Sequence, residues 1–351
     1  MFARDPRRRR RAALLGCLVA LWAVAGLGGA YQYVHRYWLY RGFPAPRTPH
    51  AVPAGSTRLV RFWSAALHQD RAYLVYTPAG YAPEAARGRR FPVVYLLHAP
   101  PGRPDGYFLA GAIGVRADVL IAEHRIPPLI MAVPYGKSRL FRNDTEWANG
   151  RAGRFMDYVL DVVHDVDRRF ATIADRRGRA IAGLSEGGYG ALNVALHHLG
   201  AFSIAESWSG YFVQTPTFAF TGASPAVLRA NSPMDEIAAL GPRIRRLGFR
   251  AWVYQGLSDS EPRSQLRLFS RRLAAAGAAV RYGFFPGGHD WGLWRAQAPR
   301  MLLAAGAWFR VPPRLPGPGL VEVGSRPPLR TARASDARRS RGAGERRVRR
   351  R

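Results

Sequence analysis

A glycine-bracketed serine between a short apolar strand and a small-residue helix is the feature that most constrains this chain. Residues 180–191 read AIAGLSEGGYGA. In this context a Gly-x-Ser-x-Gly match places the serine on a strained strand-to-helix turn, and the glycines let neighbouring backbone approach closely. A helix expected over 187–199 directs its N-terminal N–H groups toward the negative charge that develops during acyl transfer. The stretch therefore predicts that Ser185 is a nucleophile.

Alternating strands and helices predict the fold class around this serine. Strands are expected at residues 72–76, 91–98, 129–133, 204–207, 251–255 and 280–285. Helices are expected at residues 115–124, 153–170, 234–247, 262–276 and 291–309. The run 91–98 is almost continuously apolar, as expected of a strand that is buried on both faces. The alternation favours an α/β fold with a mostly parallel sheet and helices on both faces.

The N-terminal residues have the composition of a membrane-targeting segment. Residues 1–11 carry six arginines against one acid, and residues 12–30 carry no charge. A basic flank before such a run fits a signal anchor or a long signal peptide. The positive-inside rule then leaves residues 1–11 in the cytoplasm and sends the rest of the chain outside. Small residues permit cleavage after Ala30, whereas the aromatic residues that follow resemble an interfacial belt and favour the anchor.

The remaining chain divides by composition. Segment 31–57 is expected to be a proline-containing linker, 58–310 the folded domain, and 311–351 a disordered Arg-rich tail. The single cysteine, Cys17, lies in the apolar run, so disulfides and thiolate metal clusters are excluded for the domain, and no metal site is expected.

The net charge of +30 raises the question of nucleic-acid binding. Residues 1–11 contribute +5 and residues 311–351 contribute +9, so nearly half of the excess lies in the two ends. The middle of the chain has no motif in which aromatic and basic residues interleave. We therefore expect no nucleic-acid partner, and instead consider contact of the basic ends with anionic envelope polymers or lipid headgroups.

A serine nucleophile needs a base and an acid that orients the base. In α/β-hydrolases both follow the serine in the chain, the acid first and the histidine second. His289 lies on a Gly-rich loop after the strand 280–285, at a strand end where such folds place their chemistry. Asp259 follows the strand 251–255 and is the expected acid. Glu261 is the alternative, although its place before Pro262 suits the start of a helix.

Three motifs together resemble the putative-esterase family of α/β-hydrolases over about residues 58–310. They are the stretch 183–191, the GxxD that ends at Asp259, and the GGHDWxxW that begins at Gly287. The family includes S-formylglutathione hydrolases, feruloyl esterases, enterochelin-esterase-like proteins and mycolyltransferases. The runs 95–98 and 144–147 also resemble its membrane-anchored actinobacterial members. The resemblance implies a Ser185–His289–Asp259 triad, ester substrates and no cofactor.

The resemblance also implies an oxyanion hole made of backbone N–H groups, with Glu186 as one donor. Relatives usually supply the second donor from a residue that follows His-Gly, but here Ala99 and Pro100 follow His98, and proline has no N–H. The N–H of Ala99, the His98 side chain and the N–H of Gly102 are the remaining candidates. Relatives often carry methionine where Glu186 places a carboxylate beside the developing charge. Both departures predict reduced activity.

The loop 144–147 is expected near the strand ends, where Glu146, Trp147 and His98 would shape the substrate pocket. A plain packing role is the alternative for Trp147. The sequence thus favours an extracytoplasmic serine esterase or acyltransferase that acts on envelope, lipid-linked or small esters. The second hypothesis is a catalytically weak hydrolase-fold protein that binds anionic envelope components.

Overall fold

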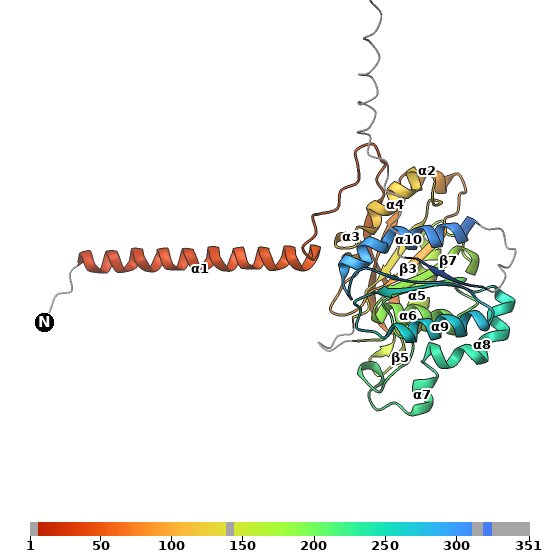
Figure 1. Ribbon diagram of the computed structural model, residues 1–351. Helices are drawn as coiled ribbons and strands as arrows, with labels where there is room; N and C mark the ends of the chain where they lie inside the picture. The colour runs from red at the N-terminus through yellow and green to blue at the C-terminus, as the bar shows by residue number, and fades with distance from the viewer. Residues whose placement is uncertain (1–5, 138–143, 311–318, 325–351) are drawn as a thin grey trace, which may run out of the picture.

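The computed structural model describes residues 6–137, 144–310 and 319–324, and a twisted sheet runs through the centre of their folded part (Figure 1). Its strands are β1 (Ser56–Ser64), β2 (Gln69–Thr77), β3 (Val93–Leu97), β4 (Ile130–Pro134), β7 (Arg179–Leu184), β8 (Ile204–Trp208), β9 (Arg250–Gly256), β10 (Ala279–Phe285) and β11 (Gly319–Val323). The strand order is β1-β2-β4-β3-β7-β8-β9-β10-β11. Strand β2 is antiparallel to both of its neighbours, and every other adjacent pair is parallel.

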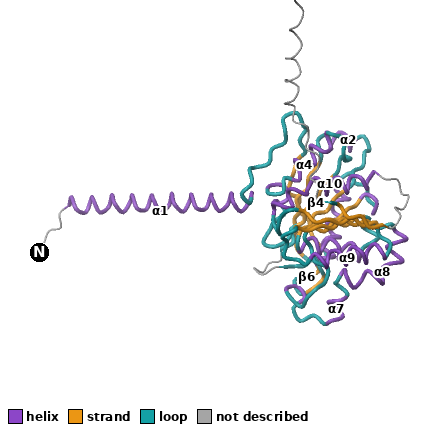
Figure 2. The backbone as a smooth tube through the Cα atoms, viewed as in Figure 1, coloured by secondary structure: helices purple, strands orange, loops and turns teal. Residues whose placement is uncertain are grey.

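Helices cover both faces of this sheet (Figure 2). They are α2 (Tyr81–Ala86), α3 (Asp105–Leu109), α4 (Ile113–Ala122), α5 (Phe155–Arg169), α6 (Glu186–His197), α7 (Pro225–Arg229), α8 (Pro233–Leu247), α9 (Arg263–Ala275) and α10 (Trp291–Arg310). Residues of α3, α4 and α10 pack in one core on one face, and those of α5, α6, α8 and α9 pack in a second core on the other. The mostly parallel sheet with helices on both faces is confirmed.

The central strands are buried at nearly every residue because helices cover them on both sides. Strands β3, β4 and β8 show this burial over their full length, in keeping with their continuous apolar sequences. A short hairpin of β5 (Asn149–Gly150) and β6 (Gly153–Arg154) lies outside the main sheet and leads into α5. The carboxyl ends of the parallel strands meet at one edge, which is where ligands bind in open α/β sheets.

The N-terminal segment is one long helix, α1 (Pro6–Tyr40), that extends away from the folded domain (Figure 1). Its stretch Ala13–Tyr33 has a mean hydropathy of 2.0, is long enough to cross a bilayer, and is not buried against the domain. The helix continues ten residues past Ala30. The prediction that 31–57 is a linker is therefore wrong for residues 31–40, which are helical.

Residues 41–55 follow the surface of the domain and are held there by one carboxylate. The side chain of Asp118 on α4 accepts hydrogen bonds from Thr48 Oγ1 at 3.0 Å, from Gly55 N at 2.9 Å and from Tyr76 Oη at 2.6 Å. The Phe43 ring lies 4.8 Å from the guanidinium carbon of Arg295 on α10. These contacts fix the path of the chain between the apolar helix and the domain.

The C-terminal prediction also needs correction. Residues 319–323, expected to be disordered within 311–351, form strand β11 and pair in parallel with β10. The hydroxyl of Tyr282 donates to Glu322 at 2.6 Å and supports this pairing. The run GLVEV is too short to show periodicity among prolines, glycines and arginines, and its partner is recognisable only in three dimensions. Apart from Gly324, the other residues of the expected tail lie outside the described part of the chain.

Candidate active site

Ser185 occupies the sharp turn between β7 and α6, as its sequence context predicts. Its backbone has φ 55° and ψ −123°, a conformation that L-residues rarely adopt. A Cβ atom on Gly183 would lie 2.1 Å from the Gly187 carbonyl oxygen, and one on Gly187 would lie 1.9 Å from the Leu97 carbonyl oxygen. Only glycine fits at these two places, so the glycines allow the turn to pack against β3.

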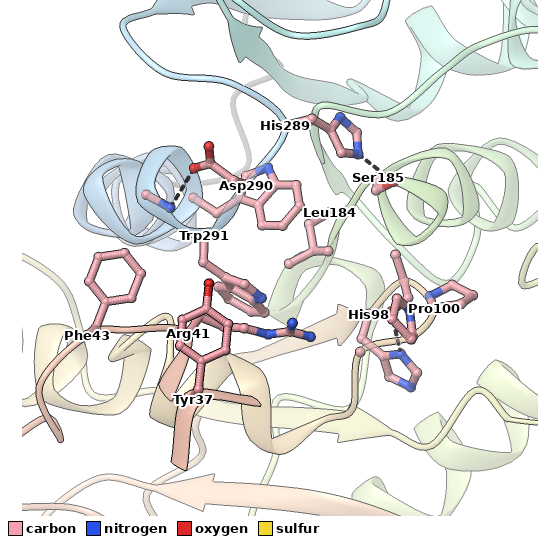
Figure 3. A pocket seen from close by; sticks show the side chains of 15 residues that line it. Tyr37, Arg41, Phe43, His98, Pro100, Leu184, Ser185, His289, Asp290 and Trp291 are labelled. Carbon is pink, nitrogen blue, oxygen red and sulfur yellow. Dashed lines mark hydrogen bonds between the residues drawn. The ribbon is translucent and has the colours of Figure 1, made fainter. Parts of the chain in front are cut away.

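Three loops at the carboxyl ends of the strands bring the predicted residues together. His289 Nε2 lies 2.8 Å from Ser185 Oγ (Figure 3). On the other side of the imidazole ring, His289 Nδ1 lies 2.9 Å from Asp259 Oδ1. The loops that carry His289 and Asp259 are tied to each other, because Ser258 N donates to Gly287 O at 3.0 Å. The histidine thus bridges the serine and the carboxylate.

The Asp259 side chain is fully buried, and its surroundings favour the carboxylate form. Burial by itself would raise its pKa, but hydrogen bonds from His289 and Ser209 outweigh burial and hold the pKa of Asp259 below its usual range. Glu261, the alternative acid, contributes its backbone N–H to Asp259 Oδ1 at 3.3 Å. Among the described residues, Asp259 therefore supplies the carboxylate that contacts the histidine.

Ser209 belongs to this group, although the sequence analysis did not identify it. It is buried directly after β8 with φ 53°, and it donates to the Asp259 carboxylate. Its Oγ accepts a hydrogen bond from Trp294 Nε1 at 3.2 Å. Trp294, the second tryptophan of the GGHDWxxW motif, thus orients Ser209, which in turn stabilises the Asp259 carboxylate. The one available signal was the position of Ser209 at a strand end.

Hydrogen bonds in the loop after β3 exclude two of the candidate oxyanion donors, the His98 side chain and Gly102 N. Burial lowers the pKa of His98 to about 4, and its Nε2 accepts a hydrogen bond from Gly136 N at 3.0 Å, so the imidazole is neutral. Gly102 N donates to Ala99 O at 2.7 Å and closes a turn. Both groups are thus engaged elsewhere. The N–H of Ala99 and the N–H of Glu186, the first residue of α6 and so without an intrahelical acceptor, remain as candidates.

The Glu186 side chain lies in a buried cluster with Glu146. Its Oε1 accepts a hydrogen bond from Glu146 N at 2.9 Å, and the Glu146 carboxylate accepts hydrogen bonds from Tyr211 and Gln214. Burial, reinforced by the negative charges of Glu146 and Asp144, raises the pKa of Glu186 well above its usual value. The raised pKa favours the neutral carboxyl form of Glu186, which lessens the expected repulsion of a developing oxyanion by this side chain.

Of the three residues expected to shape the substrate pocket, His98 lines it, whereas Glu146 and Trp147 are absent from its described lining. Trp147 is fully buried, and its indole N–H donates to His98 O at 2.8 Å. A Cβ atom on Gly190 would lie 2.6 Å from Trp147 Cβ, so helix α6 packs directly on this side chain. The packing alternative for Trp147 is what the structure shows, and Glu146 supports Glu186.

The pocket beside Ser185 has a volume of about 490 Å³ and opens at the carboxyl edge of the sheet. Its wall includes the aromatic side chains of Trp291 and Trp294 from α10 and, unexpectedly, Tyr37 and Phe43 from the N-terminal segment (Figure 3). Such an apolar lining suits an organic acyl or alcohol group. Within the described residues, no group of three or more His, Cys, Asp or Glu side chains is placed to hold a metal ion.

The buried cluster predicts a pH-dependent stability that Glu186→Gln would alter. Because the pKa of Glu186 is raised in the folded state, folded wild-type protein loses stability as pH rises from about 4.5 through that raised pKa. Glutamine resembles the protonated carboxyl and cannot ionise. Each unit by which folding raises the pKa lowers the free energy of unfolding of the ionised form by about 1.4 kcal/mol. A loss of 1 kcal/mol lowers the melting temperature of such a domain by about 2–4 °C.

We therefore expect thermal denaturation to show similar melting temperatures for wild type and variant at pH 5. At pH 8 the variant should melt at least about 3 °C higher. Glu123→Gln, which changes an exposed glutamate on the surface, is the matched control and should follow wild type at both pH values. An equal pH dependence of the melting temperature in wild type and Glu186→Gln would contradict a raised pKa of Glu186.

Comparison with known proteins agrees with this architecture. The sequence matches the family described as "Putative esterase" over residues 64–305. An endo-1,4-beta-xylanase/feruloyl esterase of Xylanibacter ruminicola is 34% identical over 142 residues, which cover 38% of this chain and 19% of that protein. An esterase of Mycobacterium tuberculosis is 29% identical over 151 residues, which cover 43% of this chain and 31% of that protein. The match thus spans less than a third of the length of either relative.

Solved structures share the fold at low sequence identity. A ferulic acid esterase superposes with a TM-score of 0.63 at 21% identity, over 73% of this chain and 99% of that chain. An S-formylglutathione hydrolase from Agrobacterium tumefaciens superposes with a TM-score of 0.59 at 17% identity, over 76% and 100% of the two chains. Because the family match covers more than half of the sequence, this chain belongs to the putative esterase family, and it has the α/β-hydrolase fold.

Proposed function

We propose that this protein is a serine carboxylic ester hydrolase in which Ser185 is the nucleophile. The observation that carries the proposal is the hydrogen-bonded series Ser185–His289–Asp259 at the mouth of an aromatic pocket, with 2.8 and 2.9 Å between the bonded atoms. A serine hydroxyl is a weak nucleophile unless a base removes its proton, and an imidazole at this distance can do so. Membership of an esterase family supports an ester as the substrate.

The geometry supports a two-step reaction. His289 Nε2 takes the Ser185 Oγ proton as Oγ attacks the ester carbonyl carbon, and it then passes that proton to the leaving alkoxide. The products of this step are an alcohol and an acyl group bound to Ser185. In the second step His289 removes a proton from a water molecule as that water attacks the acyl carbon. His289 then gives this proton to Ser185 Oγ, and the carboxylic acid is released. Transfer to a second alcohol instead of water would make the enzyme an acyltransferase by the same chemistry.

Asp259 orients the base and stabilises it when it carries a proton. Its bond to His289 Nδ1 directs Nε2 toward the serine, and its carboxylate favours the imidazolium that forms during each transfer. Asp259 in turn is held by Ser209, which Trp294 positions. In this proposal Ser209 and Trp294 are positioning residues, because they act through the acid and not on the substrate.

The negative oxygen of each tetrahedral intermediate would be stabilised by two backbone N–H groups. Glu186 contributes the first from the start of α6, where the helix dipole also favours negative charge. We assign the second to Ala99, since Pro100 has no N–H and Gly102 uses its own in a turn. Pro100, which removes one N–H from this loop, is the observation that keeps a catalytically weak hydrolase-fold binding protein as the second candidate function.

We further propose that the enzyme works outside the cytoplasm on the membrane surface. The support is α1, whose 21-residue apolar stretch is exposed along its length and follows an Arg-rich segment. A signal peptide removed after Ala30 is the alternative, and it would release the same domain into the exterior. Envelope or lipid-linked esters are the substrates that such a location makes available, and contact of the basic ends with anionic envelope components would assist.

Replacing the nucleophile tests the proposed function. Ser185→Ala should lower kcat/KM for short p-nitrophenyl esters by at least about a thousandfold, while the melting temperature stays near that of wild type. A fluorophosphonate probe should label wild type but not this variant. Ser258→Ala, on the neighbouring exposed loop, is the matched control and should keep its labelling. Wild-type protein that is neither labelled nor active would reject the proposal in favour of a binding protein.

Pro100→Ser tests how the oxyanion is stabilised. A serine at this position would add a third N–H donor beside those assigned to Glu186 and Ala99, and a donor aimed at the oxyanion gains most of its strength in the transition state. We expect kcat to rise about ten- to a hundredfold with little change in KM. Glu186→Met should help less, because it adds no donor. An unchanged or lower kcat in a folded Pro100→Ser protein would mean that the existing donors already complete the hole.

The location is tested by protease treatment of intact cells. Trypsin added outside should digest the catalytic domain, while a tag fused before residue 1 should stay protected, because the positive-inside rule places that end in the cytoplasm. The control is the same treatment after the membrane has been permeabilised, when both parts should be digested. A catalytic domain that resists trypsin until permeabilisation would place it inside the cell and overturn this part of the proposal.

A further inference from the structure

The end of the membrane helix forms part of the wall of the candidate active site. Tyr37 lies in the last turn of α1, and Arg41 and Phe43 follow within three residues of its end. All three line the same 490 Å³ pocket as Ser185 and His289. Figure 3 shows them on one side of the pocket with Ser185 and His289 on the other. We call residues 37–43 the juxtamembrane wall.

The juxtamembrane wall has a defined conformation. Arg41 and Gly42 both have positive φ values, 52° and 79°, which end the helix and turn the chain back toward the domain. Arg41 N donates to Tyr37 O at 2.6 Å, and Phe43 N donates to Tyr40 O at 2.9 Å. Arginine adopts such a φ only at a cost in energy, so contacts with the rest of the protein must hold it there.

The domain supplies such contacts at Phe43 and again further along the chain. The Phe43 ring packs on the guanidinium of Arg295, which is itself bonded to Ala110 O at 2.7 Å. Further along, Asp118 accepts hydrogen bonds from Thr48 and Gly55. The wall is thus fastened at Phe43, the segment after it is fastened at Thr48, and Arg41 lies two residues before the first of these points.

Arg41 places a cation in the lining of the same pocket as Ser185 and His289. In Figure 3 its side chain is directed into the space between Tyr37 and the loop that carries His98 and Pro100. Asp290 is the one carboxylate among the described lining residues, and its Oδ1 accepts hydrogen bonds from Gly292 N and Leu293 N at the start of α10. Among those lining residues Arg41 carries the only guanidinium or ammonium group.

We infer that Arg41 binds an anionic group of the substrate, so that the preferred substrates are esters that carry a carboxylate or a phosphate near the scissile bond. A guanidinium offers two parallel N–H donors to either anion and binds both more strongly than it binds a neutral ester. Arg41 is half-buried at the pocket rim, which leaves its charge less screened than on an open surface. This inference rests on the proposed ester hydrolase activity and specifies the substrate class of the same site.

The test compares esters that differ only in charge. The full-length protein, in micelles of an uncharged detergent, is assayed with p-nitrophenyl esters of equal acyl length that end in a methyl, carboxylate, phosphonate or trimethylammonium group. A second series carries the same charged groups on the phenol instead of the acyl chain. The measured quantity is the ratio of kcat/KM for each charged ester to that for its neutral counterpart, because this ratio cancels general effects on folding and catalysis.

Arg41→Ala should lower the ratio for an anionic ester by at least about tenfold, chiefly through KM, in one of the two series. Arg41→Lys keeps the positive charge but loses the two parallel N–H donors of arginine. The preference for the carboxylate ester should therefore fall more than the preference for the phosphonate ester. Arg41→Glu should reverse the order and favour the trimethylammonium ester. Arg47→Ala removes the same charge from an exposed position in the same segment, outside this pocket, and should leave the ratio at its wild-type value.

Asp118→Ala provides a second route to the same result. It removes the carboxylate that fastens residues 48 and 55 and leaves Arg41 in the sequence, so the anionic preference should fall as the juxtamembrane wall loosens. A preference in either series that Arg41→Ala abolishes supports the inference. Ratios that stay within about twofold of wild type in Arg41→Ala, with active enzyme, would overturn it alone. A wild-type protein that hydrolyses no ester would overturn it together with the proposed function.

Discussion

The turn at Ser185 holds a backbone conformation that costs on the order of 1–3 kcal/mol, and the architecture around it offsets that cost. Gly183 and Gly187 let the turn contact the last carbonyls of β3, where any Cβ would overlap an oxygen. Ser185 N donates to Trp208 O at 2.8 Å, which ties the turn to β8. Neighbouring strands on both sides therefore fix the serine. The same parallel pairing continues through β9 and β10 and brings the loops of Asp259 and His289 to the same edge.

The fold was predictable from the sequence wherever a strand or helix buries a continuous or periodic set of apolar residues. Strands β3, β4, β8, β9 and β10 and helices α5, α8, α9 and α10 lie within a few residues of their expected bounds. The sequence did not indicate β1, an edge strand in which only alternate residues are buried and which directly follows a proline-containing segment. It also did not indicate β11, because five residues at a sheet edge depend on their partner more than on their own pattern.

The candidate site likewise contains residues that the sequence identified and residues that it did not. Chain order and strand ends identify Ser185, Asp259 and His289, since the chemistry requires each at a loop after a strand. Ser209 and Glu146 could not be assigned roles in this manner. Ser209 contacts Asp259 only because β8 and β9 are adjacent, and Glu146 meets Glu186 across forty residues of sequence. A role that consists of supporting another side chain leaves no fixed spacing in the sequence.

The apolar helix α1 leads directly into the pocket wall, and this connection gives a membrane anchor at α1 a consequence for the site. The wall residues Tyr37, Arg41 and Phe43 all follow Ala30, so removal of a signal peptide at that point would leave the pocket lining intact. Retention of α1 in a membrane would instead limit the distance between Ser185 and the bilayer, because hydrogen bonds hold the connecting segment 41–55 against the domain. A soluble form could meet any ester of suitable charge. An anchored form would meet mainly those at the membrane surface, where anionic lipid headgroups would compete with an anionic substrate for Arg41.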